Sequence, residues 1–198
     1  YLTIAKNGDE KWPNWNTVPL QTYQGGLNAE PLSGGTPTGY YLKKYCQTAV
    51  DLRAGTASKT YHSWITFRFG EFYLNYAEAV YKYLGSPYAT DSEFTTSAVD
   101  AIKVVRTRAG MPGFPQGMTN DAFWKKYQNE RMVELAFEGH RFWDVRRWKE
   151  GDKHFKNIVE MKITKNGDDI YTYERKVKER SWDDKMYFYP IPDAERRK

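Results

Sequence analysis

The sequence has few of the residues that build disulfides and metal sites. One cysteine, Cys46, stands among 198 residues, so the chain cannot form an internal disulfide, and one thiolate does not make a metal site. The three histidines, His62, His140 and His154, lack the paired spacing of zinc ligands. We therefore expect no metal and no cofactor.

Long hydrophobic runs and dense basic runs are also missing. No apolar run is long enough to span a bilayer, and residue 1 does not open a basic-then-apolar leader. The net charge is +5 and the pI about 9.1, but 30 Lys and Arg are interspersed with 25 Asp and Glu. Nucleic-acid-binding domains concentrate basic residues on one face, so we expect no nucleic-acid partner.

Aromatic residues, in contrast, are abundant. The chain carries 16 Tyr, 10 Phe and 7 Trp, more than a core of this size requires, which suggests stacking surfaces as well as packing. The length suits one domain. We expect a single domain over 1–198 that is loop-rich over 1–60, helical over 61–150, and a hairpin with an extended tail over 151–198.

Proline and glycine interrupt residues 1–60 too often for long elements. The aromatic residues of this segment follow neither a helical nor a strand period. They can anchor irregular loops to the core, or they can form a platform that stacks on the apolar faces of sugars. The candidate ligand-binding residues are Trp12, Trp15, Tyr23, Tyr40 and Tyr41.

Apolar residues recur with helical period from Ile65 to Leu84, including Phe69, Phe72 and Tyr73, and Gly85 supplies a stop. Within this helix Arg68 is three residues from Glu71, and we expect the two to pair.

A second helix follows, capped by Thr96 or Ser97. The two helices together approach the period of tetratricopeptide repeats and predict a helical hairpin. Asn120 or Asp121 is expected to cap a third helix. Further on, Asn166-Gly167 separates β-like runs and predicts a β-hairpin.

The most unusual stretch is Asn129–Lys149, NERMVELAFEGHRFWDVRRWK. Glu130, Glu134 and Glu138 recur every four residues, which predicts one stripe of a helix. Apolar residues cover more than half of that helix, so we expect it to be buried, and buried charges must be paired. Opposite charges stand three apart at Arg131/Glu134, Glu138/Arg141 and Asp144/Arg147.

Two carboxylates at Glu134 and Glu138 could serve as the acid and base of a glycoside hydrolase. Arginines three residues away should lower their pKa values, however, whereas a general acid needs a raised pKa. We therefore favour a structural network of ion pairs and expect no catalytic residues. A hydrolase remains the alternative.

The same stretch resembles the signature of the SusD/RagB family of outer-membrane nutrient-binding lipoproteins. The closing Tyr189-Pro190-Ile191-Pro192 string resembles that family too. The positions that carry the signature and that we assign to structure are Glu130, Arg131, Glu134, Glu138, Gly139, Arg141, Asp144, Arg146, Arg147 and Trp148.

The resemblance implies a mainly helical fold of tetratricopeptide-like hairpins with long irregular loops and a small C-terminal β-hairpin. It further implies a glycan ligand, a SusC-like TonB-dependent transporter as partner, and a surface-exposed place in the outer membrane. The lipid anchor would lie before residue 1, since family members are about twice as long or longer. Peptide-binding relatives leave peptide uptake as an alternative, and a helical protein-interaction module is a third.

Overall fold

The computed structural model describes residues 4–8, 18–29, 35–47, 50, 61 and 63–198. Backbone contacts divide them into two compact units. The helical unit comprises residues 63–141. The hairpin unit combines the described residues up to 61 with residues 142–198.

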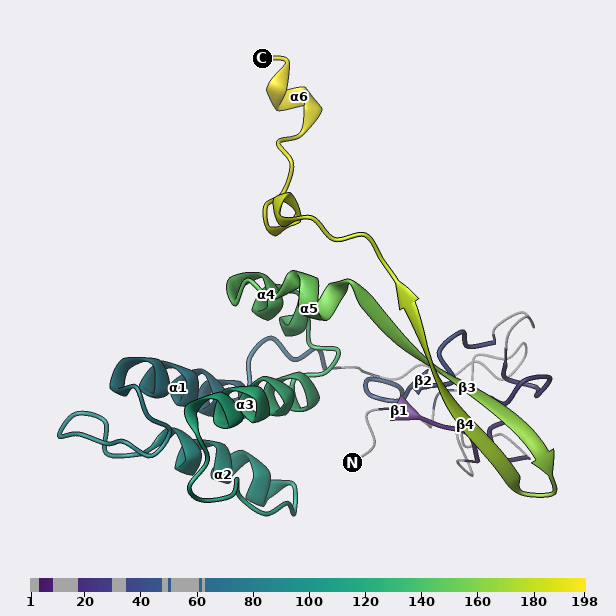
Figure 1. The fold of residues 1–198 in the computed structure, drawn as a ribbon, viewed down its shortest axis with the longest axis horizontal. Helices are drawn as coiled ribbons and strands as arrows, with labels where there is room; N and C mark the ends of the chain where they lie inside the picture. Colours follow the sequence, from purple (N-terminus) through teal and green to yellow (C-terminus); the bar gives the residue numbers. More distant parts are fainter. Residues whose placement is uncertain (1–3, 9–17, 30–34, 48–49, 51–60, 62) are drawn as a thin grey trace. The chain divides into compact units, whose positions relative to one another are not determined.

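Three helices build the helical unit: α1 (Phe69–Leu84), α2 (Ala98–Arg108) and α3 (Asn120–Glu134), as Figure 1 shows. The helices α1 and α2 pack together as the predicted helical hairpin, and α3 packs on α1. The core consists of buried aliphatic and aromatic side chains, among them Leu74, Val80, Ile102, Phe123 and Tyr127.

The first helix begins four residues later than its apolar period predicts, because Arg68 has an extended backbone (φ −149°, ψ 155°). The face that it buries also differs from the prediction. Phe69, Phe72 and Tyr73 are 82, 58 and 38% exposed, whereas Leu74 is fully buried. Large aromatic side chains therefore line an open face of α1.

Helix ends follow the local chemistry of the sequence. Gly85 ends α1 in the left-handed region (φ 71°), where it donates its N–H to Tyr81. Ser97 caps α2 by accepting the N–H of Asp100. At α3, Thr119 accepts the N–H of Ala122, so the predicted caps Asn120 and Asp121 are wrong by one or two positions.

The third helix ends at Glu134, and α4 (His140–Arg147) begins only after a turn. Phe137 and Gly139 in this turn have positive φ angles of 62° and 83°. Glu138 thus stands outside the helix, and the predicted single stripe of three glutamates is wrong. Val133 and Phe137 are 56 and 54% exposed, so the stretch is less buried than its composition predicts.

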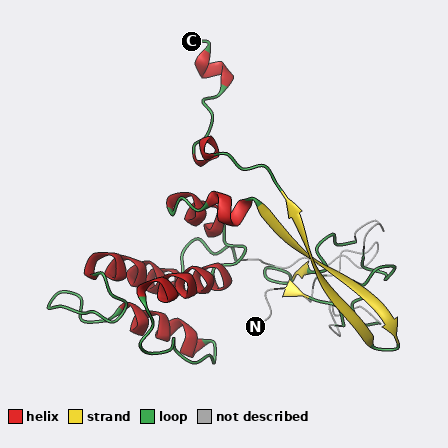
Figure 2. Ribbon diagram, viewed as in Figure 1, coloured by secondary structure: helices red, strands yellow, loops and turns green. Residues whose placement is uncertain are grey.

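A long antiparallel pair, β3 (Asn157–Gly167) and β4 (Ile170–Glu179), dominates the hairpin unit (Figure 2). The turn lies at Asp168-Asp169, two residues beyond the Asn166-Gly167 signal. A bulge between Lys165 and Gly167 takes up Asn166, and Asp169 adopts the left-handed conformation (φ 57°). The smaller elements are β1 (Ile4–Ala5), β2 (Tyr41–Leu42), α5 (Gly151–Phe155), η1 (Asp184–Tyr187) and α6 (Asp193–Arg196).

The described residues 18–29 and 35–40 dock on the outer edge of β3. The N–H of Gln24 donates to the carbonyl of Ile163 at 2.8 Å, and the N–H of Met161 donates to Thr38 at 3.2 Å. Gly39 lies so close to β3 that a Cβ there would be 2.8 Å from the Met161 carbonyl. Only glycine fits this approach, because the position also has a φ of 81°.

Six α-helices and two antiparallel strand pairs in the described part of the chain confirm the predicted helical fold class with a C-terminal β-hairpin. None of the helices described is long and apolar enough to cross a membrane. The single domain over 1–198 stays a prediction.

Replacing Ser97 by Ala tests the cap of α2. The hydroxyl accepts the Asp100 N–H at 3.2 Å and donates to the Asp100 carboxylate at 2.6 Å, and Ser97 is 3% exposed. We expect Ser97→Ala to lower the free energy of unfolding by about 1 kcal/mol in urea titrations. Ser92→Ala, at an exposed position in the preceding loop, is the control. Equal stability of both variants would contradict the assigned cap.

Candidate functional site

The first candidate is the charged cluster of the helical unit, which centres on Arg68. Its guanidinium binds Glu138 through two hydrogen bonds, from Nε at 2.7 Å and from Nη2 at 2.8 Å. Nη1 pairs with the carboxylate of Glu134, and Nη2 also donates to the Glu134 carbonyl at 2.5 Å. The Glu134 and Glu138 side chains are 12 and 4% exposed. Arg68 therefore joins the start of α1 to the end of α3 and to the turn after it.

Helix α2 joins the same cluster. Arg108 donates to Glu134 at 2.6 Å, and Arg106 pairs with Glu130. Arg131 donates to the amide oxygen of Asn75 on α1 at 2.7 Å. The acids are thus matched across helices. The predicted local pair of Arg68 with Glu71 is wrong, because Arg68 pairs with Glu134 at the end of α3 and with Glu138 in the turn after it.

The electrostatics of this cluster do not suit acid–base catalysis. Burial alone would raise the pKa of Glu134, but hydrogen bonds from Arg68 and Arg108, together with their charges, hold it below its ordinary value. Burial likewise opposes the charge of Arg68, yet its bonds to Glu138 and Glu134 outweigh this effect and raise its pKa. A guanidinium occupies the place between the two carboxylates that a scissile bond would need.

The rest of the signature surrounds this cluster or falls in the hairpin unit. Gly139 lies in the turn before α4, and Arg141 is the second residue of that helix. In the hairpin unit Arg147 pairs with Asp144 at 2.9 Å, which confirms the predicted pair. Arg146 stacks on the ring of Phe142 at 3.5 Å, and Arg147 lies 4.9 Å from the ring of Trp148.

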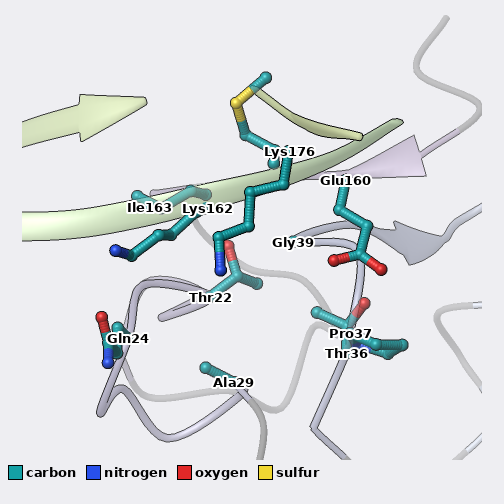
Figure 3. Close-up of a pocket in the computed structure, with 11 residues that line it drawn as sticks. Thr22, Gln24, Ala29, Thr36, Pro37, Gly39, Glu160, Lys162, Ile163 and Lys176 are labelled. Atoms are coloured by element: carbon teal, nitrogen blue, oxygen red, sulfur yellow. The ribbon is translucent and has the colours of Figure 1, made fainter. Parts of the chain in front are cut away.

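The second candidate, the loop–hairpin cavity, lies in the hairpin unit between residues 22–29 and 36–39 on one side and the strands β3 and β4 on the other (Figure 3). Its volume is about 300 Å³. Hydrogen-bonding side chains and small apolar surfaces alternate in its wall. The lining residues are Thr22, Gln24, Ala29, Thr36, Pro37, Gly39, Glu160, Met161, Lys162, Ile163 and Lys176.

Three charged side chains enter this wall from the hairpin. Lys162 is 3.9 Å from Glu174, and Glu160 is 3.7 Å from Lys178, so each has a partner of opposite sign. Lys176 extends from β4 across the cavity towards Thr22 (Figure 3) and makes no ion pair within the described part of the chain. Thr22 is 4% exposed, and its hydroxyl finds no hydrogen-bond partner among the described residues.

Three of the five residues of the predicted aromatic platform, Tyr23, Tyr40 and Tyr41, fall within the described part of the chain. Trp12 and Trp15 lie outside the described residues. Tyr41 donates its hydroxyl to the Asn28 carbonyl at 3.0 Å and packs on Ala5 and Leu20.

Tyr23 lies beside Tyr171, with ring centroids 5.6 Å apart, and Tyr40 is half-buried. Tyr23 and Tyr41 thus contact other parts of the hairpin unit, and both are close in sequence to residues that line the cavity. Their contact with a ligand stays a prediction.

A third hollow, of about 320 Å³, lies in the helical unit along the exposed aromatic face of α1. Its wall contains Phe69, Phe72, Tyr73, Tyr76, Thr96 and Ala101. The Tyr76 hydroxyl already donates to the Thr96 carbonyl at 2.9 Å, and none of the described residues that line the hollow is charged. It suits apolar surface better than a ligand rich in hydroxyls.

Sequence reasoning did not single out Thr22, Lys176 or the other polar residues of the cavity. They stand in unremarkable contexts, and only the docking of the loop on β3 brings them together. The charged residues Glu174, Lys176 and Lys178 were a weak signal, since every second residue shares one face of a strand. Within the described ranges no group of three or more His, Cys, Asp or Glu side chains could hold a metal ion.

The role of Arg68 can be tested with Arg68→Met. The change leaves the two nearly buried carboxylates of Glu134 and Glu138 without their shared cation, so we expect a loss of about 3–5 kcal/mol in the free energy of unfolding. Arg108→Met is the matched control, because this arginine is 58% exposed and pairs with the same Glu134 oxygen. It should cost at most about 1 kcal/mol. Similar losses in urea titrations would contradict the central role of Arg68.

Acid should weaken the same cluster. Because the pKa of Glu134 is lowered in the folded chain, its contribution is complete above the ordinary value of 4.5 and is lost as the pH falls through the lowered pKa. We expect the free energy of unfolding to fall below pH 4.5 more steeply in the unmodified protein than in Glu134→Gln. Identical slopes of stability against pH would contradict this assignment.

Comparisons with known proteins agree with this architecture. A solved structure of a SusD-like protein from Bacteroides fragilis NCTC 9343 is 27% identical in sequence, with a TM-score of 0.74 over 97% of this chain and 35% of that one. A SusD-like carbohydrate binding protein from the same organism matches at 22% identity, with a TM-score of 0.59 over 84% and 33% of the two chains, and supports the fold alone. No curated protein matches.

The chain thus spans about a third of the length of these solved relatives. The model of the SusD family matches residues 4–198, which is nearly the whole sequence. The chain therefore belongs to the SusD family.

Proposed function

We propose that the chain is part of a cell-surface protein that captures glycan and passes it to a SusC-like TonB-dependent transporter of the outer membrane. The protein binds its ligand without chemical conversion, and a lipid on its N-terminal region attaches it to the membrane. Family membership supports this role, and the loop–hairpin cavity is the place in this chain that suits a sugar.

The chemistry of the cavity wall is the observation that carries the proposal. A sugar ring presents hydroxyls around its edge and C–H groups on its faces, so its site needs neutral hydrogen-bonding groups beside small apolar surfaces. Thr22 and Gln24 offer the first, and Pro37 and Ile163 offer the second. The volume of about 300 Å³ lies at the lower end of ligand pockets, which span roughly 300–1,000 Å³.

Peptide uptake, the alternative within the family, fits this site less well. Extended peptides often bind by adding a strand to a free sheet edge. At the cavity, the outward N–H of Met161 and the outward carbonyl of Ile163 already bond to Thr38 and Gln24. A ligand must therefore be held by side chains, as sugars usually are.

Glycoside hydrolysis has less support. Glu134 and Glu138 share the guanidinium of Arg68, and the pKa of Glu134 is lowered. A general acid needs a carboxyl group with a raised pKa and a substrate within reach. Both acids belong to the packing of the helical unit, so we assign them no catalytic role.

Titration calorimetry with a panel of neutral and acidic oligosaccharides and a pool of peptides tests the proposed function. We expect heat from at least one saccharide and none from the peptides. Gly39→Ala should lower the affinity for the saccharide about tenfold or more, since the new Cβ would push the loop away from the Met161 carbonyl.

Gly25→Ala is the matched control. Gly25 lies in the same loop with a similar φ of 83°, but nothing stands within 4 Å of a Cβ at that position. Gly25→Ala therefore introduces the same backbone strain as Gly39→Ala but no clash with β3. Binding of peptides alone would sink the glycan proposal, and equal effects of the two alanines would remove the site from this cavity.

A further inference from the structure

The charges of the loop–hairpin cavity do not balance. Glu160 and Lys162 belong to cross-strand pairs with Lys178 and Glu174, at 3.7 and 3.9 Å. Lys176 stands directly opposite Glu160 in the strand register, yet it forms no ion pair within the described part of the chain. Its ammonium is the one charge of the lining left unmatched among the described residues.

A buried hydroxyl at the same place points to a ligand independently. Thr22 is 4% exposed, its Oγ1 has no hydrogen-bond partner among the described residues, and Figure 3 shows that oxygen turned towards the side from which Lys176 enters. A buried hydroxyl left without a partner destabilises the folded chain. A polar ligand group at this point would recover part of that cost.

An ammonium and a hydroxyl on one side of a small cavity form a pair of donors that suits a carboxylate. The oxygens of a carboxylate can accept from both, and hydrogen bonds with two charged partners are stronger than neutral ones. Of the other lining groups, the side chain of Gln24 can bind hydroxyls of the ring that carries this carboxylate, and Pro37 can contact its C–H face.

We propose that the loop–hairpin cavity binds a saccharide unit that carries a carboxylate, with Lys176 as its cation and Thr22 as a second donor. This inference rests on the proposed capture of glycan and names the class of sugar. A uronic acid has the required group on the ring itself. An acidic peptide could supply a carboxylate as well, but the occupied edge of β3 gives its backbone no partner.

The test compares tetragalacturonate with its full methyl ester by titration calorimetry on the 198-residue chain. The two ligands have the same rings and linkages and differ in the charge of the carboxyl groups. We expect the acid to bind about tenfold more tightly than the ester, which corresponds to one charge-assisted hydrogen-bond pair. The advantage of the acid should shrink as sodium chloride is added.

Lys176→Gln should remove most of this preference for the acid over the ester. Arg175→Gln is the matched control: it removes the same charge one residue away, and side chains of neighbouring strand residues point to opposite faces. It should keep the preference. Thr22→Val should lower the affinity for the acid several-fold. It should not lower the free energy of unfolding, because it removes a hydroxyl that has no partner among the described residues.

Three results would overturn the inference. The ester could bind as tightly as the acid, Lys176→Gln and Arg175→Gln could have equal effects, or tetraglutamate could bind as tightly as tetragalacturonate. If neutral sugars from the calorimetric panel still bind in the first two cases, glycan capture stands and only the acidic specificity fails. If no saccharide binds at all, both proposals fail together.

Discussion

The pairing of Arg68 with Glu134 and Glu138 is the constraint on which the helical unit depends. Two carboxylates that are 12 and 4% exposed cannot remain ionised without a cation at contact distance. One guanidinium serves both, because its planar fork can bind one carboxylate with two N–H groups and still reach another. We attribute the extended backbone at Arg68 to this role, because α1 would begin before the cluster if Arg68 were helical. The start of α1, the end of α3 and the following turn are thus fixed by one side chain.

In the hairpin unit the corresponding constraint is the outer edge of β3. An unpaired strand edge exposes N–H and carbonyl groups that need partners, and Thr38 and Gln24 of the covering loop supply them at Met161 and Ile163. Close docking requires Gly39, which has no side chain to hold the loop away from the strand. The loop then spans the face of the hairpin beside this edge, and the cavity is the space that remains between them. The site is therefore a consequence of how a sheet edge is covered.

Local chemistry made much of the fold predictable. The stop at Gly85, the cap at Ser97 and the hairpin around Asn166-Gly167 depend on a few neighbouring residues, and the structure has all three. Predictions failed where distant partners decide. The acids of α3 lie close to Arg68 only after folding, so spacing along the chain suggested the wrong partner, Glu71. The same limit applies to the cavity, whose lining comes from segments more than a hundred residues apart, such as Thr22 and Lys176.

Density of charge along the sequence is a poor guide to the binding site in this protein. The signature from Glu130 to Trp148 concentrates acids and arginines, yet Glu130, Glu134, Glu138 and Asp144 each have a cation in contact. Matched charges hold helices together and leave little to attract a ligand. Lys176 stands in a strand rich in charged residues, directly opposite Glu160, but Glu160 pairs with Lys178, and Lys176 makes no ion pair in the described part of the chain. A charge that stays unpaired after folding can attract a ligand, and the sequence alone does not show which charges stay unpaired.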